Sequence, residues 1–289
     1  MSNLRRSSSL VLLGTTLLFP ACTVPPPPAQ TGKVQQNQPA REDIVIGESF
    51  TVDSKVLAEK RRLTVYLPQN YDQEPTRRYP VLYLLDGGIK EDFHHITGIV
   101  QVSVSNGLMD PILVIGIENI DRRHDVTPPT ENPEDKKSAP RAGGSQKFRA
   151  FLKDEVFPLV ERDFRGNGER TLIGESLAGL FVMETFLEDP SLFQRYISVS
   201  PSLWWNDEFL LKHAAERLKT LPLQGRTLYL TVGDLRDNKA VTDKLADMLR
   251  QTAPPGLTWY YEPLPDEEHA TMLHAGALRA LRKFFPAKK

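Results

Sequence analysis

Three kinds of side chain that together activate a hydroxyl nucleophile follow strand-like segments of this sequence. Ser176 stands in TLIGESLAGLF, between a short apolar run and an apolar helical pattern. Asp234 and Asp237 occur in LTVGDLRDN, and His269 occurs in LPDEEHATMLH. A serine is a weak nucleophile at neutral pH, and it needs a base within hydrogen-bond reach and a third group that orients the base. The order serine, acid, histidine therefore predicts acyl-transfer chemistry at Ser176.

The turn around Ser176 resembles a nucleophile elbow. Such an elbow needs small residues two positions before and two positions after the nucleophile, because the strained turn brings the backbone close to neighbouring segments. Gly174 meets the first requirement, and Ala178 meets the second approximately. The alternative is a small serine in an ordinary strand-to-helix turn. The acids and the histidine downstream favour the catalytic interpretation.

The sequence leaves the choice of the acid open. Either Asp234 or Asp237 could cap the helix that follows instead, and the longer reach of Asp237 from the strand end favours it as the acid. His274 is the competing base, but it falls within the last helical pattern, where it is expected on the surface or in packing. We therefore assign His269 as the base.

Acyl transfer also requires hydrogen-bond donors for an oxyanion. The backbone N–H of Leu177, directly after the serine, is one expected donor. The second is the N–H of Gly88 or Gly87, in LLDGG at the end of a predicted strand. A tight turn is the alternative explanation for the two glycines.

Four side chains close to predicted strand ends are candidates for substrate binding. Arg122 and Arg123 lie near the start of a long irregular segment, residues 119–146, and an arginine there offers a planar donor fork to an anionic or catechol-bearing substrate. Trp204 and Trp205 follow another predicted strand and could form the wall of an aromatic pocket. The alternative for the arginines is a salt bridge that holds the loop in place. The alternative for the tryptophans is packing in the core.

Strand and helix patterns alternate along the chain and place these candidates at strand ends. Many of the strands are continuously apolar, which indicates burial on both faces. We therefore expect an α/β fold: a mostly parallel central sheet of about eight strands, with an antiparallel edge and helices on both faces. Ligands bind at the carboxyl ends of such strands. Pro158 is expected to kink or divide its helix. Strands are predicted at residues 49–54, 62–68, 80–86, 112–118, 170–175, 196–201, 227–233 and 257–264, and helices at 91–105, 145–164, 177–188, 207–219, 238–251 and 272–285.

Composition limits the classes of function. The 289 residues are 40% hydrophobic and 25% charged, as in an ordinary globular protein. The formal net charge of −1 gives no long-range field that would gather nucleic acid, so we expect no nucleic-acid partner. No H-E-x-x-H pattern or cysteine cluster occurs, and we expect neither a metal nor a cofactor. The oligomeric state stays open.

The first 44 residues are expected to lie outside the fold. Residues 1–22 have a positive start, a short apolar run and then the only cysteine, Cys22, which is the anatomy of a signal peptide. The stretch resembles a bacterial lipoprotein signal, in which that cysteine is acylated. Residues 23–44 form a Pro- and Gln-rich tether, and the catalytic domain spans 45–289. The resemblance implies a periplasmic protein that contacts the membrane only through a lipid anchor at Cys22. A soluble secreted protein, and a cytoplasmic protein whose apolar start is a coincidence, are the alternatives.

Several segments together carry a resemblance to a known family. They are YPVLYLLDG, FHHITGIVQ, IENIDRRHDVTP, GGSQKFRAFLKDEVFPLVERDFR, LIGESLAGLFVMETFLEDPSLFQRYISVSPSLWW and EEHATM. Across roughly residues 45–285 the chain resembles the enterochelin-esterase-like branch of the α/β-hydrolases, a family that includes siderophore esterases and S-formylglutathione hydrolase. The resemblance implies an α/β-hydrolase fold with Ser176 as the nucleophile and His269 as the base.

Two residues depart from the family's usual G-H-S-x-G-G. Glu175 and Ala178 stand where relatives have His and Gly, so a carboxylate lies beside the nucleophile. Some relatives use a Ser–His dyad without a clear acid. We expect a serine carboxylic-ester hydrolase that works through a triad or dyad and an acyl-enzyme, on a small-molecule ester of the siderophore or another type. An acyltransferase of the same fold and a non-catalytic binding lipoprotein are the alternatives.

Overall fold

The computed structural model describes residues 41–234, 236–252 and 254–288. A compact unit spans Val45–Lys289. The predicted signal peptide, the cysteine expected to be acylated and most of the tether lie outside the described residues. Within the described part, no helix has both the length and the hydropathy that are needed to cross a membrane.

Eight strands of the described chain form one sheet in the order β1-β2-β4-β3-β5-β6-β7-β8. β2 pairs antiparallel with β1 and β4, and all other neighbours pair in parallel. The predicted α/β fold, with its mostly parallel sheet and antiparallel edge, is therefore confirmed. The strands are β1 (Glu48–Ser54), β2 (Glu59–Tyr66), β3 (Tyr79–Leu85), β4 (Leu113–Ile117), β5 (Gly166–Glu175), β6 (Arg195–Val199), β7 (Arg226–Thr231) and β8 (Leu257–Tyr261).

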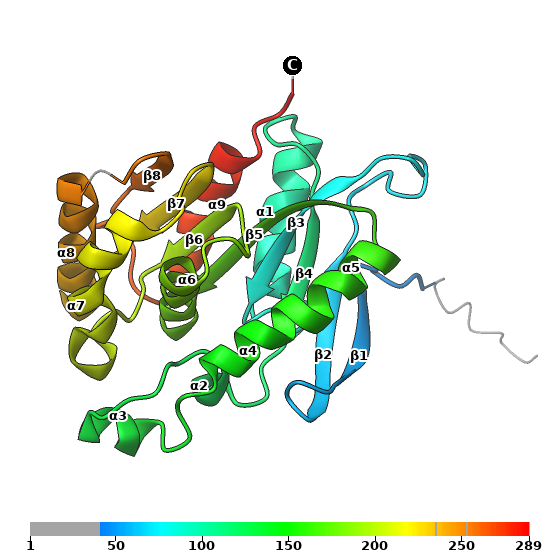
Figure 1. Ribbon diagram of the computed structural model, residues 1–289. Helices are drawn as coiled ribbons and strands as arrows, with labels where there is room; N and C mark the ends of the chain where they lie inside the picture. The colour runs from blue at the N-terminus through cyan, green and yellow to red at the C-terminus, as the bar shows by residue number, and fades with distance from the viewer. Residues whose placement is uncertain (1–40, 235, 253, 289) are drawn as a thin grey trace, which may run out of the picture. The chain divides into compact units, whose positions relative to one another are not determined.

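Helices cover both faces of this sheet (Figure 1). α1 and α9 pack on one face, and α4 to α8 pack on the other, so that the core has two layers. The alternation along β3 shows this directly, because Val81, Tyr83 and Leu85 belong to one layer and Leu82 and Leu84 to the other. The helices are α1 (Phe93–Ser105), α2 (Arg122–Asp125), α3 (Pro133–Ser138), α4 (Ser145–Phe151), α5 (Phe157–Asp163), α6 (Leu177–Glu188), α7 (Trp205–Thr220), α8 (Arg236–Thr252) and α9 (Met272–Phe284).

The helix expected over residues 145–164 is divided as the position of Pro158 predicts. α4 leads into one π-helical turn, Leu152–Val156, and α5 follows it. Proline has no N–H to donate to the carbonyl four residues earlier, and its ring clashes with that carbonyl. The wider turn therefore lies directly before the proline.

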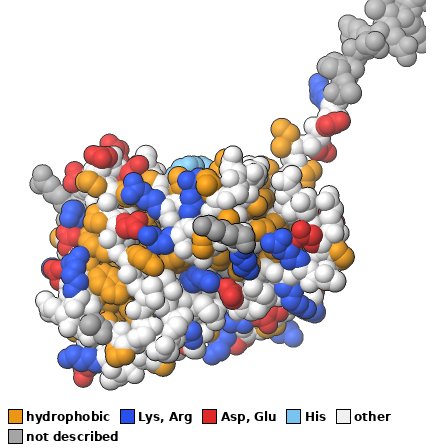
Figure 2. Space-filling model, turned by 90° about the horizontal axis from the view of Figure 1, so that it is seen from above, with side chains coloured by type: hydrophobic (Ala, Val, Ile, Leu, Met, Phe, Trp, Pro, Cys, Tyr) orange, Lys and Arg blue, Asp and Glu red, His pale blue; other side chains and the backbone are white. Residues whose placement is uncertain are grey.

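On the face of the molecule shown in Figure 2, acidic and basic side chains lie interspersed, with hydrophobic side chains between them. This mixing of signs agrees with the formal net charge of −1. Charge of one sign does not gather in a single area of this face.

Residues 119–146, expected to be irregular, contain α2 and α3 and are held by buried polar groups. The Arg61 guanidinium, which is fully buried on β2, lies 2.7 Å from a carboxylate oxygen of Asp125 at the end of α2. The guanidinium also lies over the ring of Phe148, 5.2 Å from its centroid. A charge in such a place is costly unless it is paired. The ion pair therefore fixes the start of this segment on the sheet.

Asp125→Ala is expected to lower the free energy of unfolding by about 3–5 kcal/mol, because it removes the buried partner of the Arg61 charge and leaves only the partly exposed carboxylate of Glu59, 2.8 Å away. Lys60→Ala is the matched control. It removes the pair of Lys60 with Asp53, whose side chains are 72% and 77% exposed, and a change below about 1 kcal/mol is expected. Urea denaturation of both variants measures this, and equal effects would contradict the role given to the buried pair.

Candidate active site

Ser176 lies in a strained turn between β5 and α6. Its backbone angles are φ 60° and ψ −120°, a region that non-glycine residues rarely adopt. Its N–H donates to the Val199 carbonyl at 3.0 Å, and its carbonyl accepts from the N–H groups of Ser202 at 3.0 Å and Leu180 at 2.9 Å. Such strain costs about 1–3 kcal/mol and persists only where neighbouring segments fix the backbone. The arrangement is that of a nucleophile elbow.

The small residues beside Ser176 allow this close approach. A Cβ added to Gly174 would lie 2.7 Å from the backbone of Ala178 and 2.9 Å from its Cβ. A Cβ added to Gly179 would lie 2.9 Å from the Val199 carbonyl oxygen. Ala178 is itself completely buried, and its methyl group occupies the space that Gly174 leaves. The alanine that departs from the family pattern is therefore accommodated in the turn.

Ser176 and His269 line the same pocket, of about 370 Å³. His269 follows β8 and is half-buried in the loop before α9. Burial and the nearby positive charge of Arg122 lower the pKa of its imidazole, so the ring is neutral at pH 7 and can accept a proton. The hydroxyl of Ser176 lies 3.3 Å from that of Ser202. Within the described part of the chain no hydrogen bond joins Ser176 to His269, and such bonds are often long before substrate binds.

The imidazole Nδ1 of His269 contacts a serine, at the position where an acid was predicted. Its neighbour is the hydroxyl oxygen of Ser200, at 3.1 Å. Asp234 is exposed, and among the described residues no hydrogen bond joins its carboxylate to His269, so the structure does not place it as the acid. Asp237 falls in the first turn of α8, but its side chain lies outside the described part, and its assignment stays a prediction.

The predicted oxyanion donors differ in whether their N–H groups already have an acceptor in the structure. The N–H of Leu177 begins α6 and has no acceptor among the described residues, and the positive end of the helix dipole lies there. The N–H of Gly87 donates to the Ile117 carbonyl at 3.0 Å, so the prediction for Gly87 is wrong because sheet pairing uses this donor. The N–H of Gly88 donates to the carboxylate of Glu91 at 2.7 Å.

Arg122 lines the pocket but is held there by an ion pair. Its Nε and Nη2 each lie 2.7 Å from one carboxylate oxygen of Asp86, and Nη2 also donates to the Glu175 carbonyl at 3.1 Å. This is the loop-holding alternative to substrate binding. Arg123 is exposed, donates to the Ser138 carbonyl and does not line the pocket, so the structure does not support its predicted role in substrate binding.

The two tryptophans have different environments. Trp205 is only 3% exposed and donates its indole N–H to the Pro128 carbonyl at 3.1 Å, so its prediction as a pocket wall is wrong and the core alternative holds. Trp204 is 39% exposed, and its indole N–H donates to the side-chain oxygen of Asn238 at 2.8 Å. Trp204 therefore has surface left for contact with a ligand.

Carboxyl groups line the pocket together with Ser176. Burial raises the pKa of Glu175 to about 8, and the carboxylates of Asp92 and Asp86 add to this effect. Burial also raises the pKa of Asp92 to about 6, again with a contribution from Asp86. All three line the pocket with the serine. Glu175 is therefore mostly uncharged at pH 7.

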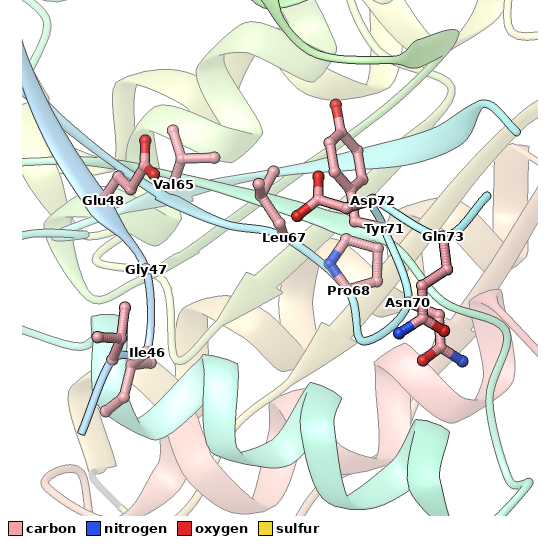
Figure 3. Close-up of a pocket in the computed structure, with 11 residues that line it drawn as sticks. Ile46, Gly47, Glu48, Val65, Leu67, Pro68, Asn70, Tyr71, Asp72 and Gln73 are labelled. Atoms are coloured by element: carbon pink, nitrogen blue, oxygen red, sulfur yellow. The ribbon is translucent and has the colours of Figure 1, made fainter. Parts of the chain in front are cut away.

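A second pocket, of about 290 Å³, lies elsewhere and is shown in Figure 3. It is formed by the segment that leads into β1, by Val65 on β2 and by the loop that follows β2. None of the predicted site residues lines it. This pocket therefore contains none of the groups that the sequence predicts for the reaction.

The structural comparison supports the class that the fold and the elbow define, the α/β-hydrolases. An IroE-like serine hydrolase from Shewanella oneidensis superposes with a TM-score of 0.76 and 28% identity, over 83% of this chain and 80% of the other. With the nucleophile elbow after β5 and a histidine after the last strand, the protein is an α/β-hydrolase.

The family follows from the sequence comparison. The model described as "Putative esterase" matches residues 54–255, and the chain belongs to this esterase family. The ferri-bacillibactin esterase of Bacillus subtilis is 34% identical over 171 residues, which cover 53% of this chain and 58% of that protein. The chain thus spans less than two thirds of this relative. The apo-salmochelin esterase of Escherichia coli is 29% identical over 227 residues, 72% of this chain and 70% of that one.

The activity of the wild-type protein is expected to fall as the pH rises through about 8. Above that pH Glu175 becomes a carboxylate beside Ser176 and opposes the negative charge that develops on the ester oxygen. Glu175→Gln keeps the side chain neutral and should abolish this decrease of kcat/KM.

The pH dependence of kcat/KM between pH 5 and 10 measures the effect. Glu268→Gln is the control, because this carboxylate is exposed and lies directly before His269 in the chain. It should leave the alkaline decrease unchanged. A decrease that is identical in Glu175→Gln and the wild type would refute the role of Glu175.

Proposed function

We propose that the protein is a serine carboxylic-ester hydrolase with Ser176 as the nucleophile and His269 as the general base. The observation that carries the proposal is the strained serine elbow that shares a pocket with a neutral histidine after the last strand. Membership of the esterase family supports the same reaction.

The proposed reaction has two halves. His269 takes the hydroxyl proton as the oxygen of Ser176 attacks the ester carbonyl, and it then gives the proton to the leaving alcohol. The N–H of Leu177 stabilises the oxyanion, and the N–H of Gly88 joins it when Glu91 is displaced. Water, activated by His269, then releases the acyl group and restores Ser176.

The proposed substrates are small esters, with siderophore-type esters first among them. Two relatives are named for ferri-bacillibactin and for apo-salmochelin. The lining of the pocket holds four carboxyl groups and one arginine. Glu175 is mostly uncharged and Arg122 offsets Asp86, so the remaining charge is negative, which favours an ester that is neutral or cationic close to Ser176. The carboxyl groups are those of Asp86, Glu91, Asp92 and Glu175.

A fluorophosphonate probe is expected to label the wild-type protein and not Ser176→Ala. Turnover of p-nitrophenyl butyrate should fall by about 10³-fold or more in the same variant, because the covalent step is lost. Ser105→Ala, which removes an exposed hydroxyl on α1, is the control and should leave both readouts unchanged. Equal labelling of the wild type and Ser176→Ala would refute the assignment. A panel with a triscatecholate trilactone and its ferric complex then ranks the substrates.

We also propose a periplasmic location with a lipid anchor at Cys22, which rests on the sequence pattern alone. In a bacterial host, the full chain is expected to incorporate radiolabelled palmitate and to fractionate with membranes. Cys22→Ser should lose the label and move to the soluble fraction. Equal labelling of both chains would contradict the anchor.

A further inference from the structure

The contact of His269 with Ser200 lies on the side of the ring that orients a catalytic histidine. In a serine hydrolase, the orienting group bonds to Nδ1 and holds the proton there, so that Nε2 is free to act as the base. Here the hydroxyl oxygen of Ser200 is 3.1 Å from Nδ1. Ser200 is fully buried directly after β6 and has φ 42°, and its N–H donates to the Thr231 carbonyl at 2.8 Å. The backbone that carries this hydroxyl is therefore fixed in position.

Ser200 is in turn held by Asn238, a buried amide at the start of α8. The side-chain nitrogen of Asn238 lies 2.6 Å from the Ser200 carbonyl oxygen and 3.2 Å from its hydroxyl oxygen. The side-chain oxygen of Asn238 accepts from the Trp204 indole at 2.8 Å. An indole N–H can only donate, so the oxygen of the amide must face Trp204 and its NH₂ group must face Ser200. The orientation of this amide is thus determined by its neighbours.

Two arrangements of protons fit the contact between Ser200 and His269. A serine hydroxyl has two acceptor positions and one donor. With one acceptor position used by the amide of Asn238, the hydroxyl either accepts Nδ1–H of His269 or donates its own proton to Nδ1. Only the first arrangement leaves on Nε2 the lone pair that general-base catalysis requires, and this is the tautomer that we assign.

We infer that Ser200, fixed by Asn238, is the residue that orients His269 for catalysis. The inference rests on the proposed function, and it gives Ser200 and Asn238 the work that a carboxylate does in a Ser–His–Asp triad. Both are positioning residues, since they act through the histidine and do not touch the substrate. Trp204, on the surface, completes the series of hydrogen bonds.

A neutral acceptor has a different electrostatic effect from a carboxylate. It accepts Nδ1–H but adds no negative charge to stabilise the imidazolium, whereas a carboxylate raises the pKa of a neighbouring histidine. The lowered pKa of His269 is in keeping with this environment. A histidine oriented by a hydroxyl alone stays unprotonated, and usable, to lower pH than a histidine paired with an acid.

The first test is Ser200→Ala in the full chain, with Ser198→Ala as the matched control. Ser198 is an equally buried serine on β6, and its hydroxyl donates to the Gly179 carbonyl at 3.0 Å instead of facing the histidine. Ser200→Ala is expected to lower kcat by about 10- to 100-fold, less than the ~10⁴-fold loss seen when a charged triad acid is neutralised. KM should be unchanged, and Ser198→Ala should keep the wild-type kcat.

The second test is Ser200→Asp, which introduces a carboxylate at a φ that aspartate tolerates. The acidic limb of the pH profile of kcat/KM is expected to move up by about one pH unit or more, because the carboxylate stabilises the imidazolium. A loss of packing alone would lower activity without moving this limb. An unmoved limb would overturn the inference.

A third readout does not depend on turnover. In ¹⁵N-labelled protein, the side-chain spectrum of His269 should show a proton on Nδ1 in the wild type and in Ser198→Ala, and a mixture of tautomers in Ser200→Ala. The same spectrum in all three would overturn the inference. So would a wild-type kcat in Ser200→Ala together with a large loss in Asp237→Asn, which would assign the role to Asp237. Fluorophosphonate labelling of Ser176 tests the proposed function separately, so that the two failures are distinguishable.

Discussion

The backbone of Ser176 is the constraint on which the site depends. A serine at φ 60° is held only because β6 accepts its N–H and two later N–H groups bond to its carbonyl. The same turn points the N–H of Leu177 into the open start of α6 and directs the Glu175 carbonyl to Arg122. Packing of α6 against β6 through Gly179 maintains this arrangement. The strain is therefore stored at the residue that we propose as the nucleophile.

Periodicity and turn chemistry predicted the elements of the fold and the positions of the main candidates. The eight strands, the divided helix at Pro158 and the elbow at Ser176 all follow local rules: apolar runs for buried strands, a missing N–H at proline and small residues at a close approach. Residues at the carboxyl ends of parallel strands lie at the same edge of the sheet, whatever their separation in the chain. The sequence alone therefore predicted that Ser176 and His269 would lie close together, and both line one pocket.

Predictions that depend on which partner a group finds in space were less successful. Gly87 was a reasonable oxyanion donor by position, but β4 uses its N–H. Trp205 and Trp204 are adjacent in the chain, yet one packs in the core and the other stays partly exposed. Ser200 gave no signal as a partner of His269, because a serine after a strand is common. The role that we infer for it rests on a contact across 69 positions of the chain.

The contact of Glu91 with Gly88 has a consequence for how the site selects its substrate. In the proposed mechanism, the carboxylate occupies in the free protein the donor that the ester oxygen needs in the transition state. An ester must therefore displace the carboxylate of Glu91 from the N–H of Gly88. A large ester can use binding energy from its remote parts for this exchange, and a small acyl ester has little to use. With this mechanism, the site would discriminate by the size of the whole molecule as well as by the bond that is cut.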